Sequence, residues 1–170
     1  ETGAVLLTDC MPVRAPHRQI IRVVKGLRGH VDLTMRLVMR FDYGLTVPWV
    51  QRVEGGLRAV AGPNALTLLS EVETHGENLS TVADFRVAAG ETRTFVLVWH
   101  LSHEPTPKLE SPHTLLATTD AWWQAWAQRC TYPGRYREAV VRSLITLKAL
   151  TLSLIHISEP TRRTPISYAV

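Results

Sequence analysis

The segment VDLTMRLVMRFDY, residues 31–43, alternates apolar and polar side chains more regularly than any other part of the chain. Every odd position is apolar: Val31, Leu33, Met35, Leu37, Met39, Phe41 and Tyr43. Only Val38 interrupts the polar even positions. A period of two predicts a strand with one buried and one solvated face. At about 3.3 Å per residue this strand is roughly 43 Å long, which favours a large antiparallel sandwich over a compact barrel.

The end of this strand carries the motif RFDYG, residues 40–44. Strand parity predicts that Tyr43 points into the core and that Arg40 and Asp42 share the opposite face. Charged residues on one face of a strand are more often part of a cross-strand charge pattern than of a binding site. We therefore interpret Arg40 and Asp42 as structural.

Further strands are predicted on both sides of this segment. Upstream, residues 3–13 form a strand that ends at Pro12, and residues 17–27 form a second strand that closes at Gly26 and Gly29. Downstream, residues 48–61 contain a hairpin or bulge at 54–56, and residues 61–64 form a turn. Residues 65–72 form a strand and residues 73–78 a loop. Residues 80–88 and 92–102 form a pair of strands joined at residues 89–91. The strand over 92–102 is apolar on both sides, which predicts a central strand covered on both faces.

Two helices follow an exposed linker at residues 104–111. Ser111 and Pro112 suit the N-cap and first position of a helix, in which Leu115, Thr119, Trp122 and Trp126 recur every three or four residues. A second helix over 135–151 has an apolar arc made of Tyr136, Ala139, Val140, Ser143, Leu144, Leu147 and Leu150. The predicted class is therefore mainly β with α: an antiparallel sandwich followed by helices.

Several motifs resemble bacterial glycoside hydrolase family 15, the glucoamylase and trehalase-like enzymes. They are RFDYG (40–44), LRAVAGP (57–63), WHLSHEP (99–105), WWQAWAQRCTY (122–132) and YREAVVRSLITLKALT (136–151). The resemblance covers about residues 3–151. It implies an N-terminal β-supersandwich over 1–104 that is incomplete at its N-terminus, a linker with a Trp-rich helix over 105–131, and the first helix of an (α/α)6 barrel over 132–151.

The resemblance also implies a function for the parent enzyme, which is inverting hydrolysis of α-glucosidic bonds in a glucan, an oligosaccharide or trehalose. That reaction uses two carboxyl groups about 6.5–9.5 Å apart. In the family both glutamates lie beyond the position that matches Thr151. The resemblance therefore predicts that this chain has no catalytic, cofactor-binding or metal-binding residue and is an inactive fragment. It also predicts that the partner of the chain is the catalytic barrel of the parent enzyme.

The chemistry-bearing residues of the chain give only weak alternatives. We interpret seven glutamates as surface charges: Glu54, Glu71, Glu73, Glu91, Glu104, Glu110 and Glu138. His100, His103 and Glu104 form HxxHE rather than the helical HExxH of zinc enzymes, so a structural or surface role is favoured over a metal site. His75 is interpreted as solvated, and Ser143 and Ser153 lack a GxSxG context.

A second functional hypothesis is a stand-alone carbohydrate-binding or interaction sandwich. Its stacking platform would be Trp49, Trp99 or the group Trp122, Trp123 and Trp126. Aromatic stripes at helical spacing are more often packing than platforms, so this hypothesis ranks below the hydrolase fragment.

Composition places few further limits on the function. The net charge is +4, but basic and acidic residues are interleaved, so we expect no nucleic-acid partner. No apolar run is long enough to cross a bilayer, so we expect no membrane partner. We also expect a cytoplasmic location. Cys10 and Cys130 lie far apart in sequence, which favours two free thiols in a reducing compartment. The chain begins with Glu1 rather than methionine, so we expect the true N-terminus to lie further upstream.

The character of the sequence changes after Thr151. Pro160 and Pro165 are incompatible with continuation of the helix. Back-translated, residues 152–162 match the transposase adapter of sequencing libraries, and residues 166–170 match the primer that follows it in the same frame. We therefore expect residues 152–170 to be a sequencing artefact without stable structure.

Overall fold

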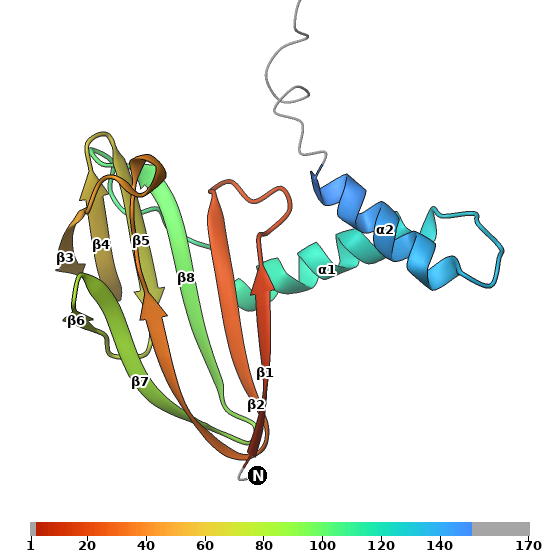
Figure 1. The fold of residues 1–170 in the computed structure, drawn as a ribbon, viewed down its shortest axis with the longest axis horizontal. Helices are drawn as coiled ribbons and strands as arrows, with labels where there is room; N and C mark the ends of the chain where they lie inside the picture. Colours follow the sequence, from red (N-terminus) through yellow and green to blue (C-terminus); the bar gives the residue numbers. More distant parts are fainter. Residues whose placement is uncertain (1–2, 151–170) are drawn as a thin grey trace, which may run out of the picture. The chain divides into compact units, whose positions relative to one another are not determined.

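The computed structural model describes residues 3–150, so the predictions for residues 152–170 lie outside the described residues. The strands are β1 (Gly3–Cys10), β2 (Gln19–Leu37), β3 (Trp49–Val53), β4 (Gly56–Ala61), β5 (Asn64–Ser70), β6 (His75–Glu77), β7 (Ser80–Ala88) and β8 (Thr92–Leu101). The helices are α1 (Pro112–Gln128) and α2 (Arg137–Leu150), with a short 3-10 turn at Asp42–Gly44. All strand pairs are antiparallel, so the prediction of a mainly β protein with helices is confirmed (Figure 1).

The eight strands form one curled sheet in the order β3-β4-β5-β8-β2-β7-β6, with β1 on the other side of β2. Strand β2 joins the two parts of this sheet, because its residues 19–25 pair with β8 and its residues 30–37 pair with β7. The predicted break at Gly26 and Gly29 is therefore wrong: a single strand runs through both glycines. Strands β7 and β8 are joined at residues 89–91, but both pair with β2 instead of with each other, which corrects the predicted pairing.

Three backbone hydrogen bonds fix the corner at which the sheet bends. The Gly26 N–H donates to the Glu91 carbonyl (2.9 Å), the Gly90 N–H donates to the Gly26 carbonyl (3.0 Å), and the Ala89 N–H donates to the Gly29 carbonyl (2.8 Å). Gly29 and Gly90 have positive φ angles of 57° and 84°, a backbone conformation that favours glycine. The glycines therefore bend a continuous ladder.

The part of the sheet that holds β5, β8 and the first half of β2 is covered on both faces. On one face Ile21, Val23 and Val96 form a buried cluster with Leu115 of α1. On the other face Val24, Leu68 and Phe95 pack with Val87 of β7. The prediction that β8 is central and covered on both faces is confirmed, and the curled sheet with a helix on its outer face is consistent with the predicted sandwich.

The motif RFDYG differs from its prediction. Strand β2 ends at Leu37, and Asp42 and Tyr43 have positive φ angles of 50° and 56°, which reverses the chain. The turn is closed by a bridge between Phe41 and Thr46, whose hydroxyl donates to an Asp42 carboxylate oxygen at 2.8 Å. Tyr43 is fully exposed instead of buried, because the parity argument ends with the strand.

The remaining elements mostly follow the predictions. The hairpin at 54–55 and the turn at 62–63 are confirmed by the pairs Val53 with Gly56 and Ala61 with Asn64. The predicted loop at 73–78 contains the short strand β6, which is too short to show a periodicity. Helix α1 begins at Pro112, as predicted, and Leu115 and Thr119 of its predicted stripe are buried.

Helix α2 lies in a second compact unit that begins at Trp122. It starts two residues later than predicted, at Arg137. None of its residues is buried, and Leu147 and Leu150 are 59% and 77% exposed. Neither helix in the described chain has the length and apolarity of a membrane-spanning segment.

Candidate functional site

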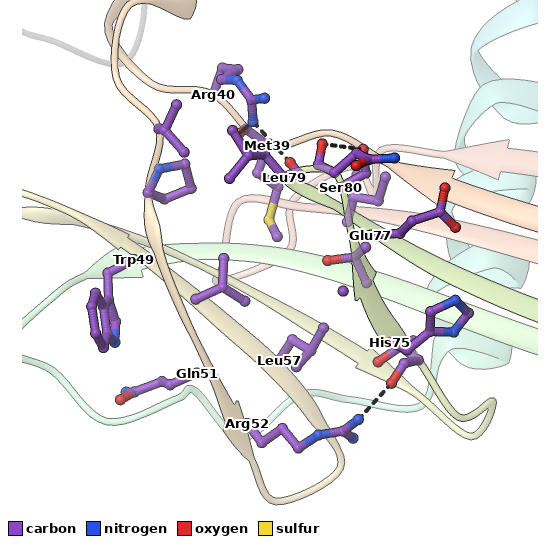
Figure 2. A pocket seen from close by; sticks show the side chains of 18 residues that line it. Met39, Arg40, Trp49, Gln51, Arg52, Leu57, His75, Glu77, Leu79 and Ser80 are labelled. Carbon is purple, nitrogen blue, oxygen red and sulfur yellow. Dashed lines mark hydrogen bonds between the residues drawn. The ribbon is translucent and has the colours of Figure 1, made fainter.

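A pocket of about 580 Å³ lies between the two edge strands β3 and β6 (Figure 2). Residues 78–81, which run from a turn into the start of β7, complete its wall together with Leu37, Met39, Arg40, Val47 and Pro48. Met39 and Leu57 are buried in this wall, and Val50 is half-exposed. The pocket is therefore a hollow with a mixed apolar and polar lining and with strand edges on two sides.

Arginine side chains hold the rim of the pocket in place. The Arg52 guanidinium donates to the Thr74 carbonyl at 2.8 Å, which links the end of β3 to the segment before β6. The Arg40 guanidinium donates to the carbonyls of Met39 and Leu79, at 2.7 and 3.3 Å. Arg40 therefore bonds to backbone carbonyls beyond the end of β2 and does not take part in the predicted cross-strand charge pattern with Asp42.

The pocket lacks the groups that hydrolysis of a glycoside requires. Among the residues that line it in the described chain, Glu77 is the only carboxylic acid, and it pairs with Arg36 at 3.3 Å. Inverting hydrolysis needs one carboxyl group as acid and a second as base. The seven glutamates interpreted as surface charges are all exposed, which confirms that interpretation.

His100 is a buried structural residue. It is 2% exposed, its Nε2 lies 2.9 Å from the Thr67 hydroxyl, and its Nδ1 lies 3.0 Å from the Leu101 carbonyl oxygen. Because a carbonyl can only accept, Nδ1 carries the proton, and in the neutral ring the Thr67 hydroxyl therefore donates to Nε2. His103 is exposed, and residues 3–150 contain no cluster of three potential metal ligands.

The tryptophans considered as sugar platforms differ in their availability. The Trp99 indole N–H donates to Asn64 at 3.1 Å, and the Arg18 guanidinium lies 5.0 Å from its ring centre. Trp49 is 76% exposed, but Figure 2 shows it on the opposite side of β3 from Arg52, projecting away from the middle of the pocket.

The tryptophans of the second unit pack edge to face. The ring centres of Trp122 and Trp123 lie 4.8 Å apart, and those of Trp123 and Trp126 lie 6.1 Å apart. Such contacts are typical of packing. The geometry favours a packing role for this group over a flat platform.

Both cysteines are free thiols, as the sequence predicts, and both are half-buried. Burial raises the pKa of the Cys10 thiol, and a hydrogen bond with Thr119 partly opposes this effect. A raised thiol pKa lowers the fraction of reactive thiolate. Cys10 is therefore poorly suited to act as a nucleophile.

No pattern in the sequence predicts the β3–β6 pocket. Its polar rim includes Arg52, His75 and Glu77, which belong to a short edge strand and to a segment predicted as a loop. Only the curling of the sheet brings these two distant edges together. No family model and no curated protein matches the chain. The resemblance to glycoside hydrolase family 15 stays a prediction.

Proposed function

We propose that the chain is the non-catalytic N-terminal portion of an inverting glycoside hydrolase of the family 15 type, acting on α-glucosidic bonds in a glucan, an oligosaccharide or trehalose. Its role in such an enzyme is structural, as a curled sheet that supports a helical catalytic barrel. The order of elements supports this proposal, because a β-rich unit is followed by a linker helix and then by a second helix.

The observation that carries the proposal is the apolar arc of α2. Leu144, Leu147 and Leu150 lie at spacings of three along the helix and are 37%, 59% and 77% exposed. A helix with an uncovered apolar stripe is suited to pack against other helices. The inner helices of an (α/α)6 barrel present such a stripe to their neighbours.

The first test is to read the source DNA across the codon for Thr151. We expect an open frame that continues into further amphipathic helices and two glutamates on barrel segments. A source gene that encodes LSLIHISEPTR followed by a stop codon would refute the proposal. As a second test, the 170-residue chain should release no glucose from maltose, maltodextrin or trehalose. Glucose release by the purified chain would also refute it.

The exposure of Trp49 favours one alternative, a carbohydrate-binding sandwich. An exposed indole face of this kind can stack on a sugar ring. Titration of the chain with maltoheptaose, followed by the indole N–H signals in NMR spectra, separates the two proposals. A selective, saturable shift of the Trp49 signal would support the binding module.

A further inference from the structure

Strand β1 is an open edge of the sheet. It pairs with β2 on one side, and no strand among residues 3–150 pairs with its other side. Its outer N–H and C=O groups therefore form an unsatisfied row, which is a template for another strand. Figure 1 shows β1 at this border of the sheet.

The usual protections of an edge strand are weak in β1. It is eight residues long, has neither lysine nor proline, and has a single charged residue, Asp9, close to its end. The irregularity in its pairing leaves Leu27 of β2 unmatched, so that β1 itself stays regular. Leu6 and Leu7 are 50% and 53% exposed although they point to opposite faces. One added strand would cover both.

The other open edges are less suitable. Strand β6 has three residues, and β3 has five, including Arg52, whose side chain is bound to the Thr74 carbonyl. The second half of β2 alternates with the charged residues Asp32 and Arg36. Short or charged edges resist the addition of a strand.

We propose that β1 pairs with β1 of a second copy of this chain, in antiparallel orientation across a two-fold axis perpendicular to the sheet. This axis keeps each face of the sheet on the same side in both copies. Residues directly opposite each other then have their side chains on the same face, so odd-numbered residues pair with odd-numbered ones and even-numbered residues with even-numbered ones. Centred on Leu6, the register places Leu6 opposite Leu6, Val5 opposite Leu7, and Gly3 opposite Asp9. The centre is then apolar on both faces, and Asp9 meets a residue without a side chain.

The next register towards the C-terminus of β1 is less favourable. Centring the pair on Leu7 would place Val5 opposite Asp9, which opposes a carboxylate to an apolar side chain. Two eight-residue edges form a small interface, so the dimer is weak and depends on concentration. The sheets of the two copies form one continuous sheet across the axis.

The test uses charge pairs at position 6 in the whole chain. In the proposed register Leu6→Lys opposes two ammonium groups and Leu6→Glu opposes two carboxylates, and like charges directly opposite each other are destabilising. Sedimentation equilibrium should show wild-type dimers and at least about tenfold weaker dimerisation for each variant alone. An equimolar mixture of the two variants should restore the dimer. Leu45→Lys, at an exposed position outside β1, should dimerise as the wild type does.

Hydrogen exchange gives an independent readout without substitutions. The amides of residues 5–8 that point away from β2 should exchange more slowly as the chain concentration rises. Four results would each overturn the proposal. They are a wild-type chain that stays monomeric, a Leu6→Lys variant that dimerises as the wild type does, an equimolar mixture of the two variants that does not dimerise, and β1 amides whose exchange does not depend on concentration. Circular dichroism of each variant checks that the fold is retained.

Discussion

The corner of the sheet depends on Gly26, and replacing this residue by alanine tests that dependence. Gly26 is buried, and a Cβ atom built on it would lie well inside 3.0 Å of the Ala88 carbonyl oxygen. The obstacle is backbone, which no side-chain rotation can relieve. The Gly26 N–H and carbonyl also make the bonds with Glu91 and Gly90 that hold the corner.

The magnitude follows from these contacts. Forcing an extra carbon into a packed interior costs about 1–3 kcal/mol. Displacing the corner also weakens two backbone hydrogen bonds, each worth about 0.5–1.5 kcal/mol net. We expect Gly26→Ala to lower the free energy of unfolding by about 3 kcal/mol, a large part of the roughly 5–15 kcal/mol of a typical domain. At about 2–4 °C per kcal/mol the Tm should fall by about 10 °C.

The matched control is Gly76→Ala in β6. A Cβ atom at Gly76 meets nothing within 4 Å, and its φ lies outside the left-handed region. Alanine there reduces the freedom of the unfolded chain, which stabilises by up to about 1 kcal/mol. Urea denaturation followed by circular dichroism measures both variants. A Gly26→Ala chain with the stability of the Gly76→Ala chain would refute the steric account of the corner.

Three further predictions test the core, the surface charges and α2. Thr67→Val removes the donor to His100 Nε2 in a fully buried site and should cost about 1–3 kcal/mol in urea denaturation, whereas an unchanged midpoint would contradict the bond. The hydrogen bond with Arg22 lowers the pKa of Asp9 below its ordinary value of 3.8, so this pair stabilises the fold above that pH and the effect is lost as the pH falls through the lowered pKa. Because both side chains are about half-exposed, Asp9→Asn should cost less than about 1 kcal/mol at pH 7, and this cost should shrink as the pH falls below 3.8, as measured by thermal unfolding. Leu147→Lys reduces the apolar arc of α2 and should reduce aggregation in light scattering, and equal scattering from both chains would show that this arc is not responsible.

The sequence predicts strand faces well because parity is a local property. From Val31 to Met39 the odd side chains are half-buried or buried and the even ones are exposed, including the apolar Val38, which is 52% exposed. Parity carries no information on where a strand ends. It therefore fails at Tyr43, where a left-handed backbone replaces the strand.

The errors at the corner have a different physical origin. Glycines in a strand pattern indicate either a turn or a bend, and the choice depends on what lies beside them. Here residues 89–91, some sixty positions later in sequence, supply the hydrogen bonds that keep β2 continuous through Gly26. The β3–β6 pocket was missed for the same reason, since its two walls meet only after the sheet has curled.

The first half of α1 shows how a linker segment can belong to a core. Leu115 is 5% exposed in a cluster with Ile21, Val23 and Val96, and Leu109 of the preceding segment packs against the same cluster. The Thr119 hydroxyl also accepts a hydrogen bond from the Val13 N–H at 3.2 Å. Strand β8 can be apolar on both faces only because this segment covers the face that β7 does not. One packing arrangement therefore accounts for both the apolar run in β8 and the apolar stripe at the start of α1. Each is a local pattern of apolar residues, which explains why both could be predicted from the sequence.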